Sequence, residues 1–135
     1  MRFRKEYLIV FFILLFIISV ELVTYIFSER TVGLIEEKTE AIILKMKQAN
    51  KNDNISDDEI NKDIGMLKET WINKQDKLSK YVEHDELEKA TNTLIILEEN
   101  ASNGEYTQAL ANGKEFEYWL EHFKEKSKLL IKNIL

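Results

Sequence analysis

The chain has 135 residues, a formal net charge of −5, only four glycines and neither cysteine nor proline. This length suits one small domain, and the missing cysteines exclude both a disulfide framework and thiolate chemistry. The acidic balance argues against nucleic-acid binding, because neutralising phosphates requires a basic surface. Without proline and with few glycines, the composition favours long helices joined by short polar loops, which predicts an all-α fold.

Residues 7–27 are the first predicted element, an apolar stretch that follows Arg2, Arg4 and Lys5. As a helix, this stretch is about 31 Å long, close to the thickness of a hydrocarbon core. A cleaved signal peptide has a shorter apolar core that ends in small residues, whereas here no Ala or Gly occurs before Gly33. We therefore interpret residues 7–27 as an uncleaved transmembrane signal anchor, with cleavage as the alternative.

The charges on either side of the apolar stretch predict its orientation. Three cations precede it, whereas Arg30 beyond it is matched by Glu29. By the positive-inside rule, residues 1–6 lie in the cytoplasm and residues 28–135 form an extracytoplasmic domain at the cell membrane. Beyond residue 27 the net charge is −6, so the folded domain is not expected to be drawn to anionic lipid.

Glu21 interrupts the apolar stretch about 9 Å of helix rise from its outer end. One interpretation is that this carboxylate lies shallow, reaches the interface or is protonated. The other is a polar contact with another membrane helix, because carboxylates inside a membrane are costly and often functional. Glu21 is therefore a candidate interaction residue.

Apolar residues at steps of three and four predict four helices in chain order. The first continues from the membrane to Ala49, with Gly33 as a point where it could bend. A polar loop then leads to a capping box, Ser56 with Glu59, at the start of a second helix that reaches Val82. Asp85 is the predicted N-cap of the third helix. The last predicted elements are a turn at Asn103–Gly104 and a fourth helix over residues 106–134.

A faint internal repeat relates the two halves of this region. Residues 41–53 resemble residues 93–105, and the helices that follow also align. The repeat predicts two helical hairpins of similar build, although any two amphipathic helices could align this well. In both cases the short loops predict a small antiparallel helical bundle.

His84 and His122 are the two histidines and the candidate metal ligands. If the last two helices turn near residue 103, His84 lies opposite Glu121, close to His122, with Asp85 nearby. Two imidazoles and a carboxylate could hold a divalent ion. The alternative is a helix-capping corner beside a partly exposed histidine. No phosphate-binding loop, nucleophile elbow or zinc-protease motif is present, so the sequence predicts no catalytic residue and no cofactor.

Trp71 and Trp119 are the largest side chains of the predicted bundle, on or beside its inward stripes. The simplest role for both is core packing, because aromatic burial dominates small helical cores. A groove that takes a peptide or a lipid chain is the alternative, so both are also candidate interaction residues.

Several short segments resemble one known family. They are "YVEHDELEKA" from Tyr81, "EYTQAL" from Glu105, "WLEHF" from Trp119 and the closing "NIL" from Asn133. With the N-terminal anchor, this layout resembles the small bacterial membrane-associated proteins of the domain of unknown function 4363 family. The resemblance implies the same architecture and marks the His84-Asp85-Glu86 corner as a family feature, and the family has no established activity.

These observations lead to two functional hypotheses of different kinds. The first is a single-pass membrane protein that serves as a non-enzymatic accessory or scaffold for another membrane or envelope protein. The second is a membrane-anchored sensor that binds a metal ion or small ligand near His84 and His122. An enzyme is the least favoured class, because no catalytic constellation emerges from the sequence.

Overall fold

The computed structural model describes residues 2–51 and 55–134, which contain helices and no strand. The all-α prediction is therefore confirmed. The elements in chain order are α1 (Arg2–Asn50), α2 (Asp57–Lys74), the short 3-10 helix η1 (Gln75–Leu78), α3 (His84–Ser102) and α4 (Tyr106–Ile134).

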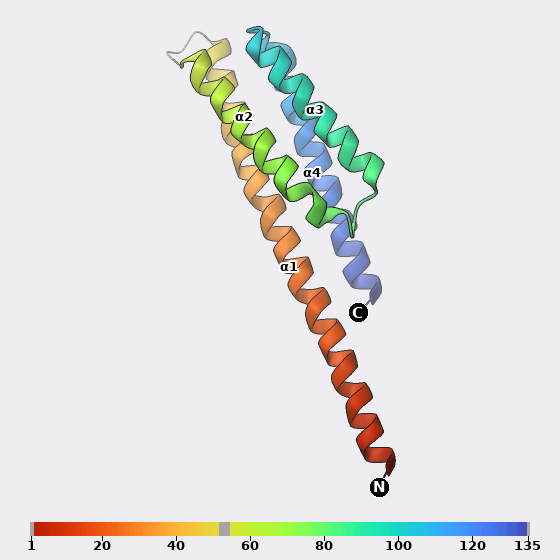
Figure 1. The fold of residues 1–135 in the computed structure, drawn as a ribbon. Coiled ribbons are helices and arrows are strands. Elements are labelled where there is room, and N and C mark those ends of the chain that lie inside the picture. The colour runs from red at the N-terminus through yellow and green to blue at the C-terminus, as the bar shows by residue number, and fades with distance from the viewer. Residues whose placement is uncertain (1, 52–54, 135) are drawn as a thin grey trace.

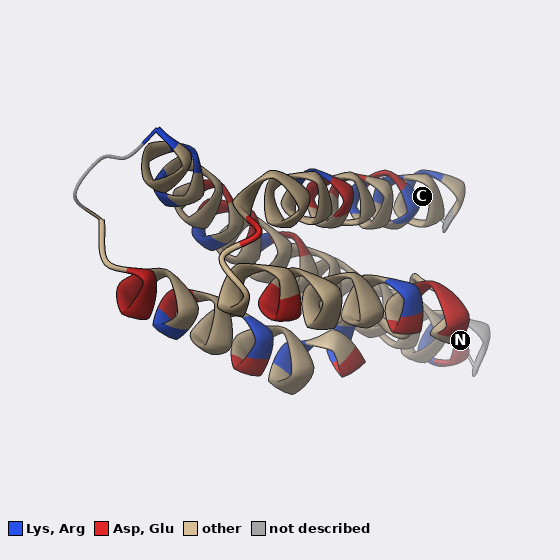
Figure 2. Ribbon diagram, turned by 90° about the horizontal axis from the view of Figure 1, so that it is seen from above, with Lys and Arg blue, Asp and Glu red and all other residues tan. Residues whose placement is uncertain are grey.

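The four α-helices form an antiparallel up-and-down bundle (Figure 1). α2 returns along α1, and α3 and α4 make a second hairpin beside the first. α1 contacts α2 and α4, and α3 contacts the same two helices, so the four form a closed ring around one core. Seen from above, acidic and basic positions are interspersed along the helices (Figure 2). The predicted bundle of two hairpins is confirmed.

α1 is a single helix of 49 residues, about 74 Å long. It runs through Gly33 without interruption, and its N-terminal part projects alone beyond the bundle (Figure 1). Within residues 2–51 and 55–134, α1 is the one helix long and apolar enough to cross a membrane, and none of its apolar window is buried. One helix therefore provides both the apolar segment and a quarter of the bundle.

The bundled part of α1 buries a stripe of mixed polarity. Thr31 and Thr39 lie in this stripe, and each hydroxyl donates to the backbone carbonyl four residues earlier, at 2.9 and 2.7 Å. A buried hydroxyl is tolerated when it is hydrogen-bonded in this way. The buried apolar residues of the same stripe are Val32, Ile35, Ile42, Ile43 and Met46.

An aromatic cluster on α2 and α4 forms the centre of the core. Trp71 is fully buried. Its ring packs edge-on against Phe116 and stacks on Phe123, with ring centroids 5.4 and 5.9 Å apart, respectively. The indole N–H of Trp71 donates to the Thr91 hydroxyl at 2.8 Å, so burial leaves this donor paired.

The helix ends differ in detail from the sequence predictions. Ser56 is the N-cap of α2, as expected, but its side chain makes no capping hydrogen bond. The Glu59 carboxylate, the other half of the predicted capping box, accepts from Lys45 at 2.9 Å. The α-helical part of α2 ends at Lys74 and does not reach Val82. The N-cap of α3 is Glu83, so the prediction of Asp85 as the cap is wrong.

The turn between α3 and α4 is as predicted. Gly104 has a φ of +74°, a left-handed conformation that costs glycine little because it has no Cβ. At this end of the bundle the Tyr106 hydroxyl donates to Asp57, which ties the start of α4 to the start of α2. Burial and this hydrogen bond raise the pKa of Tyr106 to about 12.

Candidate functional site

Glu21 pairs with a residue of its own chain. Its Oε1 accepts from the Lys80 ammonium at 2.6 Å, and the Glu21 side chain is 22% exposed. This hydrogen bond raises the pKa of Lys80, although burial alone would lower it. Neither sequence interpretation named this partner: the contact joins the outer end of the apolar segment to the turn that follows η1.

A second contact between the same two regions lies one to two helical turns further along α1. The Lys77 ammonium is 4.1 Å from the centre of the Phe27 ring, which is a cation–π geometry. Together the two contacts place η1 and the turn after it, residues 75–82, directly against residues 21–27 of α1.

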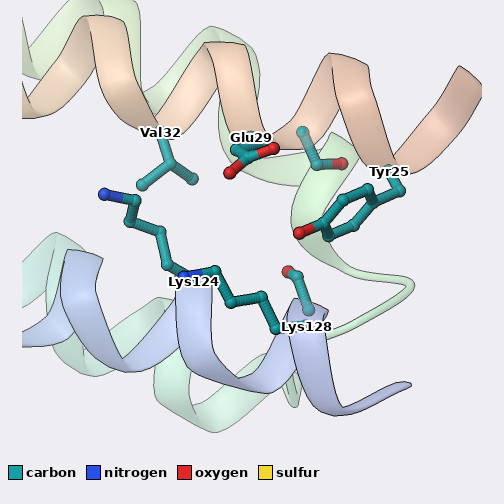
Figure 3. Close-up of a pocket in the computed structure, with 7 residues that line it drawn as sticks. Tyr25, Glu29, Val32, Lys124 and Lys128 are labelled. Atoms are coloured by element: carbon teal, nitrogen blue, oxygen red, sulfur yellow. The ribbon is translucent and has the colours of Figure 1, made fainter. Parts of the chain in front are cut away.

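The C-terminal part of α4 lies against the same stretch of α1. Figure 3 shows a small crevice with Tyr25, Glu29 and Val32 on one side and Lys124 and Lys128 on the other. Its volume of about 10 Å³ is enough for little more than a water molecule. We call residues 75–82 and 124–133 the collar, because they surround residues 21–32 of α1 on two sides.

Lys124 connects the collar to the bundle. Its ammonium donates to Glu36 at 3.0 Å, and this hydrogen bond raises the pKa of Lys124 against the opposing effect of burial. Three buried polar atoms near this end find no partner in the described part of the chain: Glu21 Oε2, Ser28 Oγ and Tyr81 Oη.

A charged cluster joins the first turn of α3 to α4. Glu86 accepts two hydrogen bonds from Lys126, at 2.7 and 2.9 Å, and lies 3.1 Å from His122 Nε2. Burial alone would raise the pKa of Glu86, but the hydrogen bonds and charges of Lys126 and His122 outweigh it and lower that pKa. The cluster is a paired carboxylate that fastens two helices together.

The candidate metal ligands do not come together in the predicted way. His84 and Asp85 are exposed at the start of α3, whereas His122 points to Glu86. Among residues 2–51 and 55–134, no group of three or more His, Asp or Glu side chains is arranged to hold a metal ion. The His84-Asp85-Glu86 corner instead forms the first turn of α3, with Glu86 as the residue that makes tertiary contacts.

The two tryptophans occupy different environments. Trp71 lies entirely inside the core, so its position gives a surface partner no access to it. Trp119 is partly buried, and the centroid of its ring lies 5.8 Å from the ring centroids of both Tyr118 and His122. Beside it, Tyr118 is 65% exposed, which makes it the most exposed aromatic side chain on the bundle itself.

The bundle surface has two open grooves away from the collar. One, of about 190 Å³, lies between α1 and α2 beside the exposed Met66. The other, of about 420 Å³, lies between α1 and α4. Its lining is mostly acidic: Glu36, Glu40, Lys114, Glu117, Tyr118 and Glu121.

Sequence reasoning missed the lysines of these contacts. Lys77 and Lys80 contact residues about fifty or sixty positions earlier in the chain, and no local pattern marks such a pairing. Lys126 likewise pairs with Glu86, 40 residues earlier in the chain. The one available signal was Glu86, which lies in a segment singled out by the family resemblance.

Comparisons with known proteins bear on the bundle more than on the apolar segment. A family model described as a domain of unknown function (DUF4363) matches residues 26–134. This range covers the bundle and begins at the outer end of the apolar segment. Comparisons with curated proteins and with solved structures give no match.

Proposed function

Because the matched residues make up most of the chain, it belongs to the domain of unknown function 4363 family, and we propose that it is a single-pass membrane protein. In this proposal residues 7–27 span the cell membrane and the N-terminus is cytoplasmic. The bundle is held on the extracytoplasmic side as a non-enzymatic accessory or scaffold for another membrane or envelope protein.

The observation that carries the proposal is the continuity of α1. The apolar segment and the bundled segment belong to one uninterrupted helix, with no flexible linker between them. The contacts of Lys80 with Glu21 and of Lys77 with Phe27 brace the junction from the side. A domain fixed to its anchor in this way keeps a constant height and angle above a membrane, which suits a part that positions a partner.

The alternative hypothesis, a sensor built on His84, Asp85 and His122, receives no support from the geometry. His122 is engaged with Glu86, and His84 and Asp85 face solvent one helix away. The scaffold therefore remains the function that the described residues support best.

Site-specific photo-crosslinking in native membranes tests the proposal. A photoreactive residue is placed in turn at Met66, Ile95 and Tyr118, which are exposed side chains on α2, α3 and α4. After irradiation the protein is purified in mild detergent, and unirradiated membranes serve as the control. We expect one position to give a discrete adduct with a single protein. Recovery of the uncrosslinked chain alone from all three would contradict the scaffold role.

A further inference from the structure

We propose that the collar is a phospholipid-binding surface. In this arrangement its exposed leucines enter the acyl boundary of the leaflet that faces the bundle, and its lysines contact lipid headgroup phosphates. The inference rests on the proposed insertion of α1 and adds a lipid ligand and a set of lipid-contacting residues to it.

The first step is the length of the apolar segment. A hydrocarbon core is about 30 Å thick and takes about 20 helical residues, which corresponds to residues 7–26. The part of α1 before the first bundle contact, residues 7–20, spans only about 21 Å. Residues 21–26 must therefore also lie at membrane depth, and whatever packs beside them is close to the lipid.

The second step is the level of the collar along α1. Lys80 contacts Glu21, Lys77 contacts Phe27, and Lys128 lines the same crevice as Tyr25. Figure 1 shows the connection between α2 and α3 and the C-terminal end of α4 alongside the middle of α1. The collar is thus level with the last 9 Å or so of the apolar segment.

The third step is the apolar character of the collar. Leu129 is 58% exposed and Leu130 is 38% exposed, at the edge of a shallow hollow of about 290 Å³ that Tyr81 also lines. On α1, in a second shallow hollow that Lys77 also lines, Val23 is 66% exposed and Phe27 is 45% exposed. These side chains make an apolar zone continuous in height with the anchor, and lipid tails would cover it.

The fourth step is the distribution of charge. Residues 28–35, 71–87 and 118–134, at the collar end, carry eight basic and seven acidic residues. The other described residues of the bundle, 36–51, 55–70 and 88–117, carry eight basic and fourteen acidic residues. The excess of acidic residues that argued against anionic lipid therefore lies outside the collar end. The exposed lysines at the collar are Lys77, Lys80, Lys128 and Lys132.

Lysines in this position suit a membrane interface. Their aliphatic stems can lie along apolar surface while the ammonium groups reach the headgroup phosphates. The collar thus combines an apolar zone with lysines at one level of the molecule.

Depth measurements on the full chain in lipid vesicles test the proposal. The chain has no native cysteine, so single variants can be spin-labelled cleanly. The labels are placed at Leu129→Cys in the collar, Ser102→Cys at the far end and Phe12→Cys in the anchor, all at exposed positions. Accessibility to oxygen and to a water-soluble nickel chelate then reports the depth of each label.

We expect the Leu129→Cys label to be more accessible to oxygen than to the chelate. The Ser102→Cys label should be more accessible to the chelate than to oxygen. Equal chelate access at both positions would overturn the inference. Spin–spin broadening at Leu129→Cys with low access to both reagents would indicate a second copy on the collar and would also overturn it. A water-exposed Phe12→Cys label would instead contradict the membrane anchor itself, so the two failures are distinguishable.

The lysine contribution is tested with spin-labelled phosphatidylglycerol and phosphatidylcholine in the same vesicles. The triple variant Lys77→Gln, Lys128→Gln and Lys132→Gln should lose the excess of motionally restricted phosphatidylglycerol over phosphatidylcholine. A matched triple variant at Lys47, Lys62 and Lys114, exposed positions toward the far end, should retain it. An excess that is unchanged in the collar variant would overturn the headgroup contact.

Discussion

Glu86 shows how one side chain can fix the geometry between two helices. It is 16% exposed at the start of α3, where both its oxygens are engaged by α4. A carboxylate that is partly removed from water is stabilising only when charged donors replace the lost hydration. Lys126 donates to both oxygens of Glu86, so the charge of this carboxylate stabilises the fold.

The pH dependence of stability follows from the lowered pKa of Glu86. The folded chain binds this proton less readily than the unfolded chain does. Glu86 therefore stabilises the fold above the unfolded carboxyl pKa, and that contribution is lost as pH falls through the folded pKa. We expect Glu86→Gln to lower the unfolding temperature at pH 7 and to differ little from the unsubstituted chain in strong acid.

Thermal unfolding of the detergent-solubilised chain, followed by circular dichroism from pH 7 to pH 2, measures this difference. Glu88→Gln is the matched control, because Glu88 is exposed two residues further along the same helix. If the two variants show the same pH dependence, the Glu86 cluster does not contribute as described.

At the scale of elements, Gly113 lets α4 approach α1 closely. A Cβ built at Gly113 would lie 3.0 Å from Ile43 Cγ1 and 3.3 Å from its Cδ1, whereas a Cβ at Gly65 in α2 meets nothing within 4 Å. Alanine is favoured over glycine inside a helix by about 0.5–1 kcal/mol. We expect Gly65→Ala to gain about that free energy of unfolding and Gly113→Ala to gain less or to lose stability. Chemical denaturation in detergent measures both, and equal gains would contradict the close contact.

The junction between α1 and the turn after η1 is a second prediction at this scale. If Glu21 and Lys80 act through each other, the effects of Glu21→Gln and Lys80→Gln on the unfolding temperature should not add. The double variant should then be about as stable as the less stable single variant. Thermal unfolding in lipid nanodiscs measures the cycle, with Asp76→Asn in the preceding η1 as an exposed control. Additive losses would show that the ion pair does not couple these elements.

Local patterns in the sequence predicted the elements but not their contacts. The apolar periodicity identified four helices, and Asn103–Gly104 identified the last turn, because both signals lie within a few neighbouring residues. The sequence did not indicate the partner of His122: Glu86, two residues beyond His84, lies 3.1 Å from its ring. Register depends on how side chains of facing helices interlock, which periodicity on one helix does not specify.

The sequence predictions of the helix ends were partly wrong for a related reason. Ser56 and Glu59 have the spacing of a capping box, but Lys45 of another helix competes for Glu59 and prevails. The same holds for Glu21, whose partner lies 59 residues away. Where a long-range charge competes with a local motif, the sequence alone does not indicate the outcome.

At the scale of the whole molecule, the continuity of α1 is the feature that gives the protein its shape. The family match covers residues 26–134, so the bundle is the family's common part, and the apolar segment extends from it along the same helix. The proposed function therefore requires that the apolar segment crosses a membrane while the bundle stays on one side of it.

The most direct test labels single cysteines in intact cells with a membrane-impermeant maleimide. The chain offers Glu6→Cys, which keeps the three cations before the apolar segment, and Ser102→Cys at the far end of the bundle, and it has no native cysteine to interfere. We predict that Ser102→Cys is labelled in intact cells and that Glu6→Cys is labelled only after permeabilisation. Labelling of both positions, or of neither, in intact cells would contradict a single-pass protein with an extracytoplasmic bundle.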